Sequence, residues 1–133
     1  MRLLFQIGLV AFGSACGGLL RWGVGAAAAR LLGAGLPYGT FIINVSGSLF
    51  LGWFSTVLAD RMLLSQHPWL RPDELRLLIA VGFAGAFTTF STFEWESHAL
   101  LRDGQSLAAT TYMVLSVFLG LLAIRAGIAL ARP

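Results

Sequence analysis

The sequence predicts an all-α membrane protein with four transmembrane helices, the third of them broken at mid-membrane. Hydrophobic residues make up 57% of the 133 residues and charged residues only 11%, about half the charged share of soluble domains. Four apolar stretches approach or exceed the roughly 20 residues that cross the hydrocarbon core of a bilayer, and they cover residues 3–29, 36–59, 74–101 and 107–130. Because the connections between them are short, residues 1–133 are expected to form a single transmembrane domain.

The first span is rich in small residues, and its most apolar part ends at an arginine. Gly13 and Gly17 lie four residues apart, which is the spacing of a close helix–helix contact in membranes. The apolar part reaches Arg21 and Trp22, and residues 23–30 continue as a weakly amphipathic extension. Arg21 either extends its side chain to the lipid headgroups or creates an electropositive vestibule that attracts anions.

The second span carries an amide in its apolar interior. Pro37 opens the span, where its missing N–H suits the first turn of a helix, and Tyr38 beside it suits the membrane interface. Asn44 follows well inside the span. Two interpretations of Asn44 remain open: an interhelical hydrogen bond worth about 1 kcal/mol, or a donor to an anion pathway, since polar groups inside a membrane are by default functional.

The third span contains the most informative feature of the chain. Its residues 82–93 read GFAGAFTTFSTF, and each glycine costs a helix up to about 1 kcal/mol. A helix break at membrane depth is tolerated only where it is buried in protein or lines a watery cavity, so the segment predicts freed backbone groups where ions are handled. Gly85 and Thr88 flank the tightest part of the expected break. Their carbonyls either hold a cation, as half-helices do in transporters, or belong to a purely structural kink.

Aromatic rings and hydroxyls continue this pattern after the break. Phe90 and Phe93 are three residues apart and share a face if the helix resumes there. The edge of an aromatic ring is electropositive, so two rings could hold a small anion between them; ordinary packing is the alternative. In the fourth span, Tyr112 and Ser116 are four residues apart on one face, either as an ion relay or as packing hydroxyls.

The charged residues argue against two classes of function. All nine basic residues are arginines scattered along the chain, whereas nucleic-acid binding needs a dense basic face. Glu94 and Glu96 follow the break without a nucleophile, a histidine dyad or metal-ligand spacing, so no enzyme is expected.

The positive-inside rule favours one orientation only weakly, and a small bias is also what a chain inserting in both orientations would show. For four spans the two sets are Arg2, Arg61, Arg71, Arg76 and Arg132 against Arg30 and Arg102.

Several of these residues together form a recognisable pattern. Its parts are Arg21-Trp22 after the first span, Pro37-Tyr38-Gly39-Thr40 followed by Asn44 and Gly47, and Gly82-Phe83-x-Gly85 running into Thr88-Thr89-Phe90-Ser91-Thr92-Phe93. With the four-span layout and the total length, the pattern resembles the Fluc (CrcB) family of fluoride channels over the whole chain.

The resemblance implies a dual-topology homodimer, in which two antiparallel copies enclose two pores and fluoride crosses passively. It implies a structural sodium ion, Na+, at the dimer interface, held by the backbone carbonyls of Gly85 and Thr88. It also places the protein in the lipid bilayer of a bacterial inner (plasma) membrane as a multi-pass protein. There, the export of fluoride from the cytoplasm would lower fluoride toxicity.

The resemblance further implies roles for single residues. Phe90 and Phe93 match facing phenylalanines along the fluoride path, and Asn44 matches an essential asparagine. Gly120 and Ile124 stand where some relatives carry further hydroxyls, so the polar track on the last helix is expected to be shorter here. The implied pathway residues are Asn44, Thr89, Phe90, Ser91, Phe93, Tyr112 and Ser116, and the implied vestibule residues are Arg21 and Glu96.

Two other classes of protein are alternatives to a fluoride channel. A proton-coupled exporter of the small multidrug type also has dual topology, but it needs an intramembrane acid, which the first two spans lack. A non-transporting assembly subunit is the third possibility. Flux through liposomes that contain only this chain would exclude it.

Overall fold

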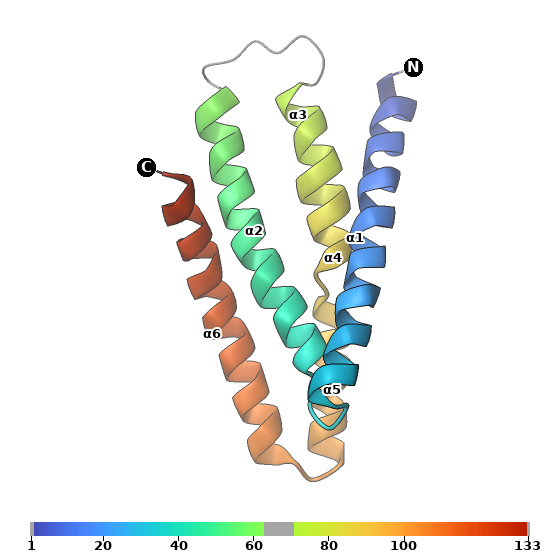
Figure 1. The fold of residues 1–133 in the computed structure, drawn as a ribbon, viewed down its shortest axis with the longest axis vertical. Coiled ribbons are helices and arrows are strands. Elements are labelled where there is room, and N and C mark those ends of the chain that lie inside the picture. The colour runs from blue at the N-terminus through green and yellow to red at the C-terminus, as the bar shows by residue number, and fades with distance from the viewer. Residues whose placement is uncertain (1, 63–70, 133) are drawn as a thin grey trace.

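The computed structural model describes residues 2–62 and 71–132, and the regular elements in these ranges are helices. The third span is built from four consecutive pieces, of which η1 is a π-helix; Figure 1 labels the other three, α3, α4 and α5. In chain order the elements are α1 (Arg2–Leu32), α2 (Tyr38–Met62), α3 (Pro72–Leu75), η1 (Arg76–Ala84), α4 (Gly85–Phe87), α5 (Phe90–Arg102) and α6 (Ser106–Ala131).

Four helical spans of the described chain are long and apolar enough to cross a membrane, so the predicted class of membrane protein is confirmed. The first span ends later than predicted, because the alanines at 26–29 are strong helix formers and α1 continues to Leu32. Pro37 immediately precedes α2 instead of lying inside its first turn. The spans are Arg2–Leu32, Tyr38–Asp60, Pro72–Arg102 and Ser106–Ala131.

Two glycines reverse the chain at the same end of the bundle. Gly33 follows α1 with φ of 84° and Gly104 follows α5 with φ of 76°, a left-handed conformation that glycine adopts without steric cost. The turn after α5 is closed by the Gln105 N–H, which donates to the Leu100 carbonyl at 2.9 Å. Figure 1 shows both turns at one end, with the two chain termini at the other, as a four-span topology requires.

Close helix contacts depend on small residues, as predicted for α1. A Cβ atom on Gly13 would overlap the Leu78 carbonyl oxygen of η1, and one on Gly17 would overlap the Phe83 carbonyl oxygen. The backbones of α1 and η1 therefore touch directly, which confirms the predicted close-packing pair. On the other side of the bundle, a Cβ on Gly127 of α6 would overlap the Leu49 carbonyl oxygen of α2.

The helical pattern of the third span is interrupted at two threonines. Gly85 is still helical, with φ of −64° and ψ of −35°, but Thr88 has φ of −79° and ψ of 160°, and Thr89 has φ of −151° and ψ of 119°. Both threonines are extended, and α5 begins at Phe90. The tight part of the interruption thus lies at Thr88 and Thr89, after the glycine-rich segment instead of within it.

Candidate functional site

An amide of α2 binds the backbone of the interruption. The Thr89 N–H donates to Asn44 Oδ1 at 2.8 Å, and Asn44 Nδ2 donates to the Thr89 carbonyl at 2.9 Å. The two bonds replace hydrogen bonds that a continuous helix would have made, so the asparagine stabilises the extended conformation. One N–H of the amide is used in this way, which leaves a second N–H on Nδ2.

The same interruption removes the helical donors of several carbonyl groups, including those of Gly85 and Thr88. In a continuous α-helix the N–H of Thr89 would bond to the Gly85 carbonyl and the N–H of Thr92 to the Thr88 carbonyl. In the structure the Thr89 N–H goes to Asn44, and the Thr92 N–H donates to Thr89 Oγ1 at 3.2 Å. The carbonyl oxygens of Gly85 and Thr88 therefore lack the N–H donors that a continuous helix would supply. The Ala84 carbonyl, by contrast, accepts from both the N–H and the Oγ1 of Thr88, at 3.0 and 2.9 Å.

Thr89 also begins the next helix. Its Oγ1 accepts from the Thr92 N–H and donates to Thr92 Oγ1 at 2.9 Å, as expected of a threonine at the N-cap position. The start of α5 carries the positive end of the helix dipole, which favours anions. Thr89 is among the pathway residues that the resemblance implies, but its role as an N-cap was not predicted, although a threonine three residues before another hydroxyl residue was the available signal.

The two phenylalanines of α5 are neighbours in different surroundings. The ring centroids of Phe90 and Phe93 lie 5.9 Å apart, and that of Phe93 lies 5.2 Å from Tyr112 of α6. Phe93 is only 6% exposed, whereas Phe90 is 74% exposed and projects away from its own chain. Ser91, next to it, is also exposed. The structure thus brings Phe93 to the other site residues but leaves Phe90 and Ser91 on an outer face.

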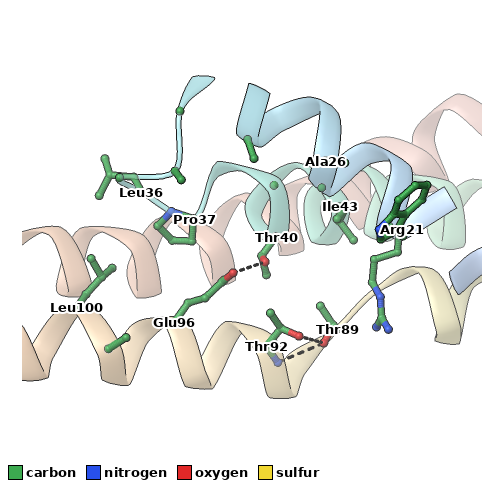
Figure 2. Close-up of a pocket in the computed structure, with 18 of the residues that line it drawn as sticks. Arg21, Ala26, Leu36, Pro37, Thr40, Ile43, Thr89, Thr92, Glu96 and Leu100 are labelled. Carbon is green, nitrogen blue, oxygen red and sulfur yellow. Dashed lines mark hydrogen bonds between the residues drawn. The ribbon is translucent and has the colours of Figure 1, made fainter. Parts of the chain in front are cut away.

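A carboxylate joins three helices beside these rings. Glu96 of α5 accepts a hydrogen bond from Thr40 Oγ1 of α2 at 2.8 Å and another from the Tyr112 hydroxyl of α6 at 2.9 Å; Figure 2 shows the contact with Thr40. From the sequence, Glu96 and Tyr112 were assigned to separate parts of the site, and no role was predicted for Thr40. The available signal was spacing, because Thr40 precedes Asn44 by four residues and so shares its face of α2.

Ser116 follows Tyr112 by one turn of α6, and its Oγ is buried without a hydrogen-bond partner among the described residues. An unpaired buried hydroxyl costs about 1–3 kcal/mol, so this site is suited to a ligand that accepts a hydrogen bond. One turn further, a Cβ on Gly120 would lie 3.8 Å from Ser48 Oγ of α2. The Ser48 side chain of α2 therefore lies beside Gly120 of α6.

A cavity of about 650 Å³ leads from the turn end of the bundle to the interruption. Its lining includes Arg21 of α1, Thr89 and Thr92 at the interruption, and Glu96 of α5. Figure 2 shows Arg21 projecting from α1 toward the segment that carries Thr89. Within the described ranges, Arg21 forms no ion pair, so its charge faces the cavity without a fixed counter-ion. The two predicted vestibule residues share this cavity.

Within the described residues, no group of three or more His, Cys, Asp or Glu residues could hold a metal ion. The oxygen ligands available to a cation near the interruption are neutral ones, from the backbone and from hydroxyl or amide side chains. The carbonyls of Gly85 and Thr88, which have lost their helical donors, are suited to that role.

The fold and the site together define a small multi-pass membrane protein with a polar cavity that ends at an interrupted helix. The family model for the CrcB-like protein, Camphor Resistance (CrcB), matches residues 8–128, and the chain belongs to this family.

Three relatives are similar over nearly the whole chain, and each is named fluoride-specific ion channel FluC. The protein of Chloroflexus aurantiacus is 45% identical over 92% of this chain and 92% of its own length. That of Rhizobium johnstonii is 40% identical over 97% and 98%, and that of Caulobacter sp. is 42% identical over 93% and 92%.

Proposed function

We propose that this chain is a fluoride-selective passive ion channel that exports fluoride from the cytoplasm. The observation that carries the proposal is the similarity, over at least 92% of the chain, to proteins named as fluoride-specific channels. The site supports it, because the described residues that we place between the vestibule cavity and Ser116 present neutral amide and hydroxyl groups and no basic side chain.

The chemistry of the pathway suits a small, strongly hydrated anion. A channel must replace the water around such an ion with close donors, yet bind it weakly enough for release. Hydroxyls, an amide and electropositive ring edges supply donors without a charge that would trap fluoride. We assign the pathway to Asn44, Thr89, Phe90, Ser91, Phe93, Tyr112 and Ser116, with Arg21 and Glu96 in the vestibule.

No coupling to an energy source is needed for export. Hydrogen fluoride that diffuses in from an acidic medium dissociates at the higher cytoplasmic pH, which leaves the anion trapped inside. A membrane potential, negative inside, drives a monovalent anion outward by about 2.3 kcal/mol per 100 mV. We therefore place the channel in a bacterial inner (plasma) membrane, where this leak lowers fluoride toxicity.

The proposed working unit is a dual-topology homodimer of two antiparallel copies, with the interrupted helix at mid-membrane. Its support is the outer face of α5, where the 74% exposed Phe90 lies beside the exposed hydroxyl of Ser91. Polar groups inside a membrane are expected to face protein or water instead of lipid. A second copy would cover this face and would bring its own Phe90 toward the pathway of the first.

A structural sodium ion, shared by the two copies, completes the proposal. Its ligands would be the Gly85 and Thr88 carbonyls, whose helical donors are diverted to Asn44 Oδ1 and Thr89 Oγ1. Backbone oxygens are hard ligands that suit a small hard cation. The ion would neutralise carbonyl dipoles that meet at the centre of the dimer.

The first prediction tests the function itself. Liposomes that contain only the purified chain should release a fluoride load, measured with a fluoride electrode, and should retain chloride. Release should proceed with equal pH on both sides, because no proton is coupled to the neutral donors of the pathway. Equal release of chloride would contradict the proposed selectivity for fluoride. Strict dependence on a proton gradient would favour the small multidrug-type exporter instead.

The second prediction concerns the aromatic pair. Phe90→Ile and Phe93→Ile should each lower fluoride efflux roughly two- to tenfold, because an aromatic contact contributes about 0.5–1.5 kcal/mol beyond burial. Phe90 is 74% exposed in its own chain, so a loss there cannot come from single-chain packing. Phe12→Ile, at a phenylalanine of α1 that is 67% exposed, is the matched control. If both α5 variants conduct like the parent, the two rings only pack.

A further inference from the structure

Gly47 faces the interruption of the third span from one turn beyond Asn44 on α2. It is buried, and a Cβ atom built on it would overlap Cγ2 of Thr88 and approach Cδ1 of Phe87 to 3.1 Å. Two successive turns of α2 therefore meet the interruption. Asn44 binds the backbone of Thr89 through two hydrogen bonds, and Gly47 accommodates the methyl group of Thr88.

The Thr88 side chain cannot readily turn away from Gly47. Its Oγ1 donates to the Ala84 carbonyl at 2.9 Å, and its N–H donates to the same oxygen at 3.0 Å. A β-branched side chain has few allowed χ1 rotamers, so the hydroxyl bond to Ala84 also directs the methyl group toward Gly47. An added atom at Gly47 would have to break that hydrogen bond or displace the backbone of Thr88.

We propose that Gly47 is a positioning residue of the conduction pathway. The space at Gly47 sets how closely α2 approaches Thr88, and this approach lets the Asn44 amide reach Thr89. A larger residue at Gly47 would separate α2 from the interruption and disturb both asparagine hydrogen bonds without touching either partner. The inference rests on the proposed function, because the geometry that Gly47 maintains is that of the fluoride pathway.

The experiment is a double-mutant cycle on Gly47 and Thr88. Gly47→Ala should lower fluoride efflux from liposomes roughly tenfold, in line with the cost of overpacking a closely packed site. Thr88→Ser removes only Cγ2, the atom that the new Cβ would overlap, and keeps the hydroxyl for Ala84. In the Thr88→Ser background, Gly47→Ala should therefore lower efflux by no more than about twofold, because residues in contact couple and distant residues do not.

The matched control is Gly8→Ala on α1, where a new Cβ meets nothing within 4 Å, and it should conduct like the parent. Equal efflux of Gly47→Ala and the parent would overturn the proposal. So would an equal loss in both Thr88 backgrounds, which indicates a general packing defect. Where Gly47→Ala does not fold, recovery of folded, conducting protein by the double variant supports the proposal, and failure to recover overturns it.

Thermal unfolding in detergent separates this inference from the proposed function. If the parent itself releases no fluoride, the channel function fails. The thermal unfolding midpoint then tests the contact at Gly47. If Gly47→Ala lowers the midpoint and the added Thr88→Ser restores it, the contact is supported. If Gly47→Ala does not lower the midpoint, the contact is contradicted.

Discussion

Fluoride efflux through Asn44→Leu is expected to fall to the level of protein-free liposomes. The leucine leaves the N–H and the carbonyl of Thr89 without the partners that they have at 2.8 and 2.9 Å. Each unpaired buried group costs about 1–3 kcal/mol, so the conducting arrangement becomes at least roughly 30-fold less populated. The sequence alone suggested one hydrogen bond of about 1 kcal/mol, and the structure therefore predicts a larger effect.

The matched control for this variant is Ser46→Ala, two residues further along α2. Ser46 is exposed, and among the described residues its Oγ donates only to the Ile42 and Ile43 carbonyls of its own helix. It should conduct like the parent. Size-exclusion chromatography of Asn44→Leu should show the same assembly as the parent. Loss of flux together with loss of assembly would assign Asn44 to bundle stability, and unchanged flux would remove it from the pathway.

The two interpretations of Asn44 prove compatible in the structure. One Nδ2–H and Oδ1 hold the Thr89 backbone, which is the interhelical hydrogen bond that composition and position suggested. A second N–H remains on the same nitrogen and is the group that could meet an anion. The sequence could not separate these roles, because an amide has more hydrogen-bonding groups than either role uses.

The four spans could be predicted because they depend on local composition alone. Apolar length identifies a membrane helix whatever it packs against, and the close contact at Gly13 and Gly17 follows from residue size. The position of the interruption could not be predicted in this way. Glycine propensity pointed to the segment around Gly85, but Gly85 remains helical and a side chain from α2 captures Thr89 instead.

The π-helical turn and the Thr40 contact were not predicted, because neither follows from the spacing of side chains along one helix. In η1 the Gly85 N–H bonds to the carbonyls of Ala80 and Gly82, a pattern with no counterpart in side-chain periodicity. Thr40, Glu96 and Tyr112 come from three helices, so only the packed bundle brings them together. Spacing along one helix predicts a shared face, but it does not predict which face of another helix lies opposite.

Gly85→Leu is expected to abolish fluoride efflux while the single chain still folds. Within one chain, a Cβ at Gly85 meets only the Ala80 carbonyl oxygen, at the ordinary distance of 3.8 Å. Leucine also favours the helical conformation that Gly85 adopts, by up to about 1 kcal/mol. The single chain therefore has room for a Cβ at this position, and we expect the loss to arise from the proposed partner copy and shared sodium ion, which would lie close to it.

Three measurements on Gly85→Leu distinguish these causes. Circular dichroism should show the helical content of the parent, light scattering in detergent should show monomers instead of dimers, and added sodium should no longer raise the thermal unfolding midpoint. Gly8→Leu, at an open position of α1, should remain dimeric and sodium-responsive. A Gly85→Leu protein that stays dimeric, binds sodium and conducts fluoride would contradict the proposed two-fold cation site at the Gly85 and Thr88 carbonyls, because a leucine at the proposed dimer centre would leave no room for one.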